Sequence, residues 1–238
     1  MSKLLVGVVL LAFSASLSAA ETGFLEKTWK SPKGEAIPYV VFVPHGYKKD
    51  APTPTILFLH GSGETKGGAK KPVEVGLGTA IKAREKTFPF LTIIPQSQKR
   101  TWKADSDDGK MAMAILEEVS KEYSVDPKRT YLLGLSMGGS GTWSLAAAYP
   151  DKWAAISPIC SGGEVAIVDK IKHLPCWYFV GDQDSANTVK KSREIIEALR
   201  KAGAKVKYTE YPGVGHNSWD KAYATDELYT WLAEQVKK

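Results

Sequence analysis

The chain contains 238 residues, of which 43% are hydrophobic and 24% are charged, and its formal net charge is +6 at pH 7. This composition is ordinary for a globular protein with a large core, and the sequence has no low-complexity stretch, no internal repeat and no pattern typical of a nucleic-acid-binding module. Lysines and acidic residues are interspersed, which indicates a solvated surface, although the positive balance would also attract acidic polymers such as uronate-bearing polysaccharides.

The first twenty residues have the pattern of a secretory signal peptide. Lys3 gives a positive start, residues 4–13 are apolar, and residues 18–20 are small, which predicts cleavage before Glu21. The apolar stretch is too short for a membrane-spanning helix, and a retained N-terminal anchor is the alternative. We therefore expect residues 21–238 to form a single domain that is secreted or periplasmic.

Hydrophobic patterning predicts an N-terminal antiparallel hairpin followed by alternating strands and helices. The hairpin pairs residues 25–30 with residues 37–44. The later strands are predicted at 55–60, 91–95, 130–135, 153–159, 176–180 and 205–211, and the helices at 77–85, 109–123, 139–149, 188–202 and 223–236. This alternation predicts an α/β fold with a mostly parallel twisted sheet, helices on both faces, and a substrate site beyond the C-terminal strand ends.

A G-x-S-x-G motif lies between a predicted strand and a predicted helix. It reads GLSMG at residues 134–138. In a nucleophile elbow of this kind, the sharp turn lifts the serine out of the sheet and aims the first N–H groups of the following helix at the reacting carbonyl. Ser136 is therefore the candidate nucleophile. A lone motif of this kind could equally hold a turn or helix-capping serine, so the interpretation depends on partners elsewhere in the chain.

Three segments together resemble a known family. They are LFLHGSGE at residues 57–64, Pro95-Gln96 with the later Trp102, and GLSMGG at residues 134–139. In this order and spacing they resemble the α/β-hydrolase superfamily, in particular the small secreted carboxylesterases grouped with predicted peptidases, polyhydroxyalkanoate depolymerases and feruloyl or acetylxylan esterases. The resemblance covers nearly all of residues 24–238 and implies the α/β-hydrolase fold.

Four histidines are candidates for the general base that would activate Ser136. His216 follows the last predicted strand, in a glycine-flanked loop on the site side of the sheet. His45 and His173 are expected on the wrong side, and His60 opens a glycine-rich loop that it is expected to brace. The predicted base is therefore His216.

The acid that orients the imidazole should follow the strand predicted at 176–180, where both Asp182 and Asp184 stand. In the esterases that the chain resembles, the acid usually comes three residues after the glycine that ends this strand, which implies Asp184 and leaves Asp182 as the alternative. The order Ser136, Asp184, His216 is the order found in α/β-hydrolases.

Two backbone N–H groups are expected to form the oxyanion hole. One is the N–H of Met137, directly after the nucleophile, and the other comes from the loop after the strand at 55–60. Ser62 is the favoured second donor, with Gly63 as the alternative. Glu64, in the same loop, either fixes that loop or contacts substrate.

Trp102 and Trp219 are predicted to lie in loops on the site side and to form substrate-binding walls, although both could be ordinary packing aromatics. The two cysteines, Cys160 and Cys176, are expected at opposite ends of neighbouring parallel strands, roughly 15 Å apart. A disulfide tolerates a Cα separation of at most about 7 Å, so two free, buried thiols are predicted. The scattered histidines and cysteines predict no metal site, and no cofactor fingerprint is present.

These features predict a secreted serine carboxylesterase that hydrolyses short-chain or polysaccharide-linked acetyl or feruloyl esters through an acyl-enzyme. Residues 160–175 are too few to form a large cap, which predicts an open site and disfavours a lipase. The alternatives are a serine peptidase of the prolyl-oligopeptidase type and an inactive binding protein on a hydrolase scaffold. The expected partner is an ester substrate, with no nucleic acid and, after signal cleavage, no membrane; the oligomeric state is left open.

Overall fold

The computed structural model describes residues 21–238, so the predicted signal peptide lies outside the described residues. Within them, the helices are too short or too polar to cross a membrane.

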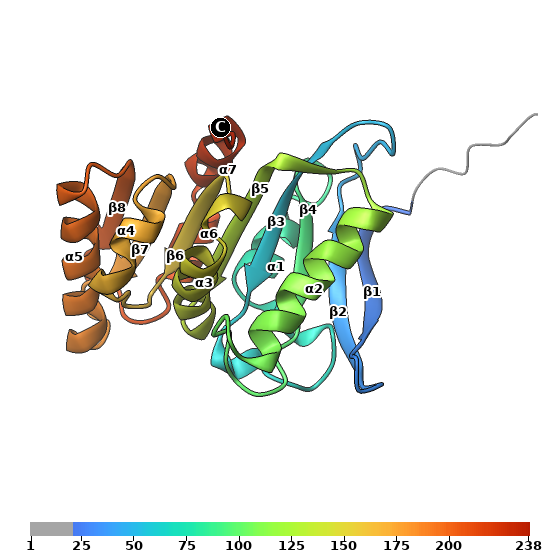
Figure 1. Ribbon diagram of the computed structural model, residues 1–238, viewed down its shortest axis with the longest axis horizontal. Coiled ribbons are helices and arrows are strands. Elements are labelled where there is room, and N and C mark those ends of the chain that lie inside the picture. The colour runs from blue at the N-terminus through green and yellow to red at the C-terminus, as the bar shows by residue number, and fades with distance from the viewer. Residues whose placement is uncertain (1–20) are drawn as a thin grey trace, which may run out of the picture.

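One mixed sheet of eight strands organises the described part of the chain, in the order β1-β2-β4-β3-β5-β6-β7-β8 (Figure 1). The strands β1 and β2 pair antiparallel, as do β2 and β4, and all later neighbours pair parallel. The strands are β1 (Gly23–Lys30), β2 (Ala36–Val43), β3 (Thr53–Leu59), β4 (Leu91–Pro95), β5 (Val125–Leu135), β6 (Ala155–Ile159), β7 (Cys176–Gly181) and β8 (Val206–Tyr211). The predicted α/β-hydrolase fold with its antiparallel hairpin is confirmed.

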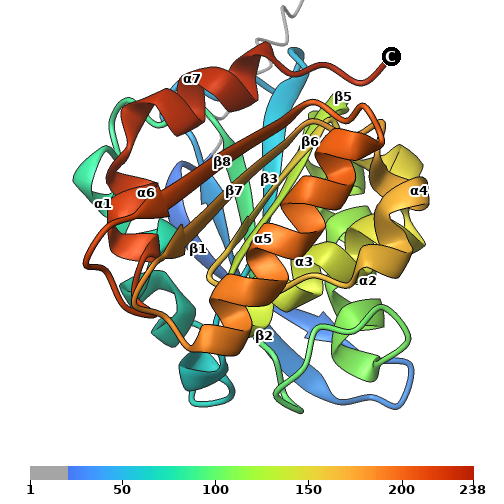
Figure 2. The same cartoon turned by 90° about the vertical axis from the view of Figure 1, so that its left-hand side faces the viewer.

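Helices cover both faces of this sheet (Figure 2). One face carries α2 (Asp107–Glu122), α3 (Met137–Ala148), α4 (Val168–Ile171) and α5 (Ala186–Lys201), and the other carries α1 (Leu77–Ala83), α6 (Trp219–Ala224) and α7 (Asp226–Glu234). Each face has its own core, because successive side chains of a strand point to opposite sides. In β5, for example, Leu132 packs into one core and Leu133 into the other. The inner strands are thus buried on both faces, and the candidate site lies at their C-terminal ends.

The C-terminal helix differs from its prediction. The sequence predicts one helix over 223–236, but the structure has α6 and α7 with a break at Thr225, whose backbone is extended at φ −78° and ψ 108°. The Thr225 hydroxyl donates to the Lys221 carbonyl at 2.9 Å, and two acids open α7, where negative charge is favourable. Arg84 fixes the break by donating to the Ala224 carbonyl and to Asp226. The prediction missed a helix start inside a continuous apolar pattern.

Both cysteines are free and buried, as predicted. Cys160 follows the C-terminal end of β6, whereas Cys176 opens β7 and pairs in register with Ile156 at the other end of β6. Burial raises the pKa of both thiols.

A thiol-reactive reagent tests this burial. We expect the native protein to react with neither Cys160 nor Cys176 over minutes, because the thiolate is the nucleophile and burial suppresses it. Both thiols should react after unfolding in denaturant. Ellman's reagent with an absorbance readout measures this; rapid labelling of the native protein would contradict the described packing.

Candidate active site

Ser136 stands at a sharp turn between β5 and α3. Its backbone has φ 54° and ψ −117°, in the left-handed half of conformational space that residues other than glycine rarely occupy. The Ser136 N–H donates to the Ile159 carbonyl at 2.9 Å and lies 3.2 Å from the sulfur of Cys160, while the Ser136 carbonyl accepts from Ser140 in the first turn of α3. The neighbouring strand β6 and helix α3 therefore hold the turn in its strained shape.

Two glycines make this turn possible. A Cβ on Gly134 would lie 2.2 Å from the carbonyl oxygen of Gly138, and a Cβ on Gly138 would lie 1.8 Å from the carbonyl oxygen of Leu59. Any larger residue would push the start of α3 away from β5 and β3. The G-x-S-x-G spacing thus follows from the closeness of α3 to two strand ends.

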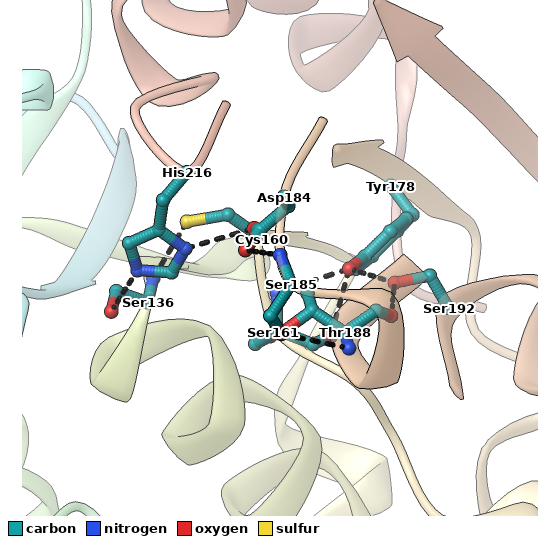
Figure 3. A network of polar contacts seen from close by, with 9 residues as sticks. All are labelled: Ser136, Cys160, Ser161, Tyr178, Asp184, Ser185, Thr188, Ser192 and His216. Atoms are coloured by element: carbon teal, nitrogen blue, oxygen red, sulfur yellow. Dashed lines mark hydrogen bonds and ion pairs between the residues drawn. The ribbon is translucent and has the colours of Figure 1, made fainter. Parts of the chain in front are cut away.

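The structure brings Ser136, His216 and Asp184 into one hydrogen-bonded row (Figure 3). The Ser136 Oγ lies 2.8 Å from His216 Nε2, and His216 Nδ1 lies 2.8 Å from Asp184 Oδ2. When the serine donates to Nε2, the ring proton is on Nδ1 and is donated to the carboxylate, which is the tautomer that a general base requires. The arrangement can deprotonate the Ser136 hydroxyl.

The side chains of His216 and Asp184 differ sharply in burial. The Asp184 side chain is 4% exposed, whereas the His216 side chain is 49% exposed. The second oxygen of Asp184 accepts the N–H of Ser185 at 2.6 Å, so the carboxylate cannot rotate freely. A fixed, covered acid and an accessible imidazole suit a site that admits substrate from solvent.

The loops that carry the acid and the base are joined to each other. The Asp182 N–H donates to the Tyr211 carbonyl, Gln183 N–H donates to the Val214 carbonyl, and the Asp182 carboxylate accepts the N–H of Gly213 at 2.8 Å. Asp182, the alternative acid in the sequence prediction, thus holds the turn before His216 and does not contact the imidazole. Asp184 is the acid that does.

Ser62 and Met137, whose backbone N–H groups are the expected oxyanion donors, each stand at the start of a helix. Met137 opens α3, and Ser62 opens the short 3-10 helix η1 (Ser62–Glu64) in the loop after β3. Within residues 21–238, neither N–H donates to a protein acceptor, as is usual for the first residues of a helix. A Cβ on Gly61 would lie only 3.7 Å from the Ser136 Cβ, so this loop runs directly beside the nucleophile.

A proline at position 62 tests the second donor. Gly61 is extended, with φ −76° and ψ 179°, which is the conformation favoured before proline, and proline is tolerated at the first position of a helix. Ser62→Pro removes the N–H, and we expect kcat for an activated ester to fall about 10²- to 10³-fold with little change in KM. Ser62→Ala, which keeps the N–H, is the matched control and should retain activity within a few-fold; equal losses in both variants would exclude the donor role.

His60 braces the loop after β3 (residues 60–68), named the oxyanion loop for its candidate donor Ser62, as predicted. It is buried, its Nε2 accepts the N–H of Ser97 at 3.0 Å, and its Nδ1 therefore carries the proton and donates to the Gly61 carbonyl at 2.6 Å. Trp102 donates from its indole nitrogen to the His60 carbonyl at 3.0 Å. Burial lowers the pKa of His60 to about 4, so this ring is neutral near pH 7.

The lowered pKa of His60 makes stability depend on pH. The native state binds fewer protons than the unfolded state between pH 6.5 and about 4, so the free energy of unfolding decreases as pH falls through this window. The shift corresponds to about 3 kcal/mol. Urea unfolding at pH 7 and pH 4.5 should show this loss of unfolding free energy in the wild type and a smaller loss in His60→Gln. Equal losses in the two proteins would contradict a neutral, buried ring.

The two predicted substrate walls have different surroundings. Trp102 is 1% exposed and packs edge-on against His60 with ring centroids 5.1 Å apart, so most of its surface is used in packing. Trp219 is half-buried at the start of α6, and its ring lies edge-on to His216 with centroids 5.5 Å apart. Trp219 thus lies beside His216, whereas Trp102 supports the oxyanion loop through its contacts with His60.

A hollow of about 460 Å³ opens next to Met137. Trp102, although buried, contributes to its wall. Other lining residues come from the loop after β4, from α3 and from the segment after β6, and include Arg100, Lys103, Ser140, Trp143 and Glu164. Because Met137 directly follows Ser136, the hollow is placed to receive part of a substrate bound at Ser136.

Three supporting residues were not predicted. Cys160, at φ 46°, lies under the Ser136 N–H, and the Tyr178 hydroxyl holds the following turn through the backbone of Ser161 (Figure 3). Gln96 lies within hydrogen-bond distance of three carbonyls of the oxyanion loop. No local pattern marks these roles, because each depends on a contact between distant segments.

The chain is similar to several known proteins. The model of the dienelactone hydrolase family matches residues 36–227. A bifunctional acetylxylan esterase/xylanase of Neocallimastix patriciarum is 28% identical over 153 residues, covering 60% of this chain and 21% of that protein. A protein named "Probable feruloyl esterase C" from Aspergillus flavus is 24% identical over 129 residues, covering 54% of this chain and 47% of that protein.

Among solved structures, the crystal structure of a thermostable esterase superposes with a TM-score of 0.81 at 32% identity, covering 90% of this chain and 63% of that one. The chain thus spans about one fifth to two thirds of the length of these three proteins. Within residues 21–238, no group of three or more His, Cys, Asp or Glu side chains is arranged to hold a metal ion.

Proposed function

The chain belongs to the dienelactone hydrolase family of α/β-hydrolases, and on this basis we propose that it is a serine carboxylesterase. The observation that carries the proposal is the row of hydrogen bonds from Ser136 through His216 to Asp184. A serine hydroxyl is a weak nucleophile by itself, and this row supplies the base and the orienting acid that activate it.

The reaction follows from the geometry. His216 Nε2 takes the proton of Ser136 as Oγ attacks the ester carbonyl, and the N–H groups of Met137 and Ser62 stabilise the resulting oxyanion. His216 then gives the proton to the departing alcohol, which leaves an acyl group on Ser136. Water, deprotonated by the same imidazole, attacks the acyl-enzyme and releases the carboxylic acid and the free serine.

The proposed substrates are short-chain esters and acetyl or feruloyl groups on polysaccharides. Two relatives carry the names acetylxylan esterase/xylanase and feruloyl esterase, which support this choice. The open site supports it as well, because residues 160–175 hold only the short helices η4 (Val165–Ile167) and α4, and His216 is half exposed. A bulky polymer could therefore reach the serine. Secretion through the predicted signal peptide at residues 1–20 is part of the proposal.

A substrate screen tests the proposal. p-Nitrophenyl esters from acetate to decanoate, methyl ferulate, acetylated xylan and a peptide p-nitroanilide are incubated with the protein and with Ser136→Ala. We expect hydrolysis of short esters and of acetylated xylan by the wild type only, with a burst of alcohol release for an activated ester if deacylation is the slower step. Cleavage of the anilide but not of esters would favour the peptidase, and no cleavage at all would favour a binding protein.

A further inference from the structure

Glu64 places a carboxylate beside the nucleophile. Its Oε2 lies 3.0 Å, and the Ser136 Cβ 3.7 Å, from the point that a Cβ on Gly61 would occupy. The Glu64 side chain is 12% exposed, so most of it is covered by protein while its oxygens keep some access to solvent. The charge therefore lies in the space next to Ser136 and the oxyanion donors.

The carboxylate has no part in fixing its own loop. Gln96 does this, since its side-chain nitrogen lies 3.1 Å from the Glu64 carbonyl oxygen and 2.8 Å from the carbonyl oxygens of Lys66 and Gly68. The Lys66 N–H adds a bond to the Ser97 carbonyl. In the described part of the chain, no group donates a hydrogen bond to the Glu64 carboxylate.

Among residues 21–238, no cationic side chain forms an ion pair with Glu64 at pH 7. The nearest candidate is His60, whose Nδ1 lies 4.0 Å from Oε2. That ring is neutral at pH 7 because burial lowers its pKa to about 4, and its Nδ1 proton is already donated to the Gly61 carbonyl. Covering a carboxylate without donors is unfavourable, and its two oxygens can accept about four hydrogen bonds. Its solvent-accessible oxygens therefore accept hydrogen bonds from water in the free protein, and a bound substrate can replace that water only with donors of its own.

A positively charged substrate group is a poor candidate for the donor to Glu64. Arg100 points a guanidinium nitrogen at the Ser62 hydroxyl at 3.5 Å, and both Arg100 and Lys103 line the hollow next to Met137. Neither forms an ion pair within residues 21–238. These positive charges and the net charge of +6 disfavour cationic substrates, so a neutral hydroxyl group is the substrate donor best suited to replace water at Glu64.

Resting on the proposed esterase function, we propose that Glu64 accepts a hydrogen bond from a hydroxyl group next to the ester oxygen on the alcohol part of the substrate. Acetyl groups carry no donor, and the phenolic hydroxyl of a feruloyl group is far from the carbonyl, so the donor belongs to the alcohol. The preferred substrates are then monoesters of vicinal diols, as on a sugar ring. In this proposal Glu64 determines the preference for the alcohol part of the substrate and is not a member of the triad.

A matched pair of acetates tests the inference. Cyclohexyl acetate and trans-2-hydroxycyclohexyl acetate share the acyl group and the ring and differ in one hydroxyl. We expect the wild type to favour the hydroxylated ester in kcat/KM, and Glu64→Gln to reduce kcat/KM for it about ten- to hundredfold, as for the loss of a charge-assisted hydrogen bond. Cyclohexyl acetate should be hydrolysed unchanged or slightly faster, because a negative charge has left the vicinity of the oxyanion.

The control is Glu74→Gln, at an exposed acid that ends the short helix η2 (Lys71–Glu74), and it should change kcat/KM for neither acetate. Equal preference of the wild type for the two acetates, or an equal fall of both in Glu64→Gln, would overturn the role of Glu64 but leave the esterase function intact. Failure of the wild type to hydrolyse either acetate or p-nitrophenyl acetate would instead overturn the proposed function and the inference with it.

Discussion

Replacing Ser136 with alanine is expected to reduce kcat for p-nitrophenyl acetate by about 10⁵-fold or more, the scale seen when a triad nucleophile is removed. The change deletes the hydroxyl oxygen that lies 2.8 Å from His216 Nε2 and leaves the proposed oxyanion donors in place. The small residual rate should therefore come from binding and from the oxyanion hole, without an acyl-enzyme. Stopped-flow absorbance at 400 nm measures both the steady-state rate and any burst.

Ser120→Ala, on the exposed side of α2, is the control for this substitution and should retain full activity. Circular dichroism should show both variants folded, because alanine at position 136 only loses the hydroxyl. Activity of Ser136→Ala within tenfold of the wild type would mean that another group performs the attack.

Replacing Asp184 with asparagine is expected to lower kcat by about 10⁴-fold, with KM little changed. An amide in place of the carboxylate can donate to His216 Nδ1, which would turn the imidazole to the tautomer that has its proton on Nε2. Such a ring cannot accept the proton of Ser136. The negative charge that stabilises the imidazolium in the transition state is lost at the same time.

Asp182→Asn is the matched comparison for this second substitution. Asp182 accepts the N–H of Gly213 at 2.8 Å, and an asparagine oxygen can accept the same bond, so kcat should change only a few-fold. The two variants differ by position alone, two residues apart in one loop. If Asp182→Asn were the more damaging of the two, the assignment of the acid would be wrong.

The sequence predicted the fold well where a local pattern carries the information. Apolar runs such as the one in β4 mark strands buried on both faces, and the observed β4 has the predicted bounds of 91–95. The elbow at Ser136 was predictable because its glycines are required by contacts within one turn of the chain and with the adjoining strand. The break at Thr225 was missed, because the apolar pattern continues across it and only the local capping geometry reveals it.

Contacts between distant segments explain what the sequence left open. Asp182 and Asp184 are equivalent by position after β7, and the structure separates them because only one carboxylate reaches His216, 32 residues away along the chain. Trp102 was predicted to form a substrate wall. Its indole donates to the His60 carbonyl and is buried, so the residue serves mainly in packing and contributes only part of the wall of the hollow next to Met137. Glu64 was predicted either to fix its loop or to contact substrate. Gln96 fixes the loop through four contacts, so the Glu64 carboxylate is not needed for that role.

Labelling with a fluorophosphonate tests the central claim most directly, because this reagent phosphonylates a serine only when a neighbouring base activates it. Intact-protein and peptide mass spectrometry should find a single adduct, on Ser136, in the wild type and in Asp182→Asn, and labelling should be strongly slowed in His216→Ala and absent in Ser136→Ala. An adduct on another residue, or hydrolysis of esters by a protein whose Ser136 stays unlabelled, would contradict the proposed roles of Ser136, His216 and Asp184.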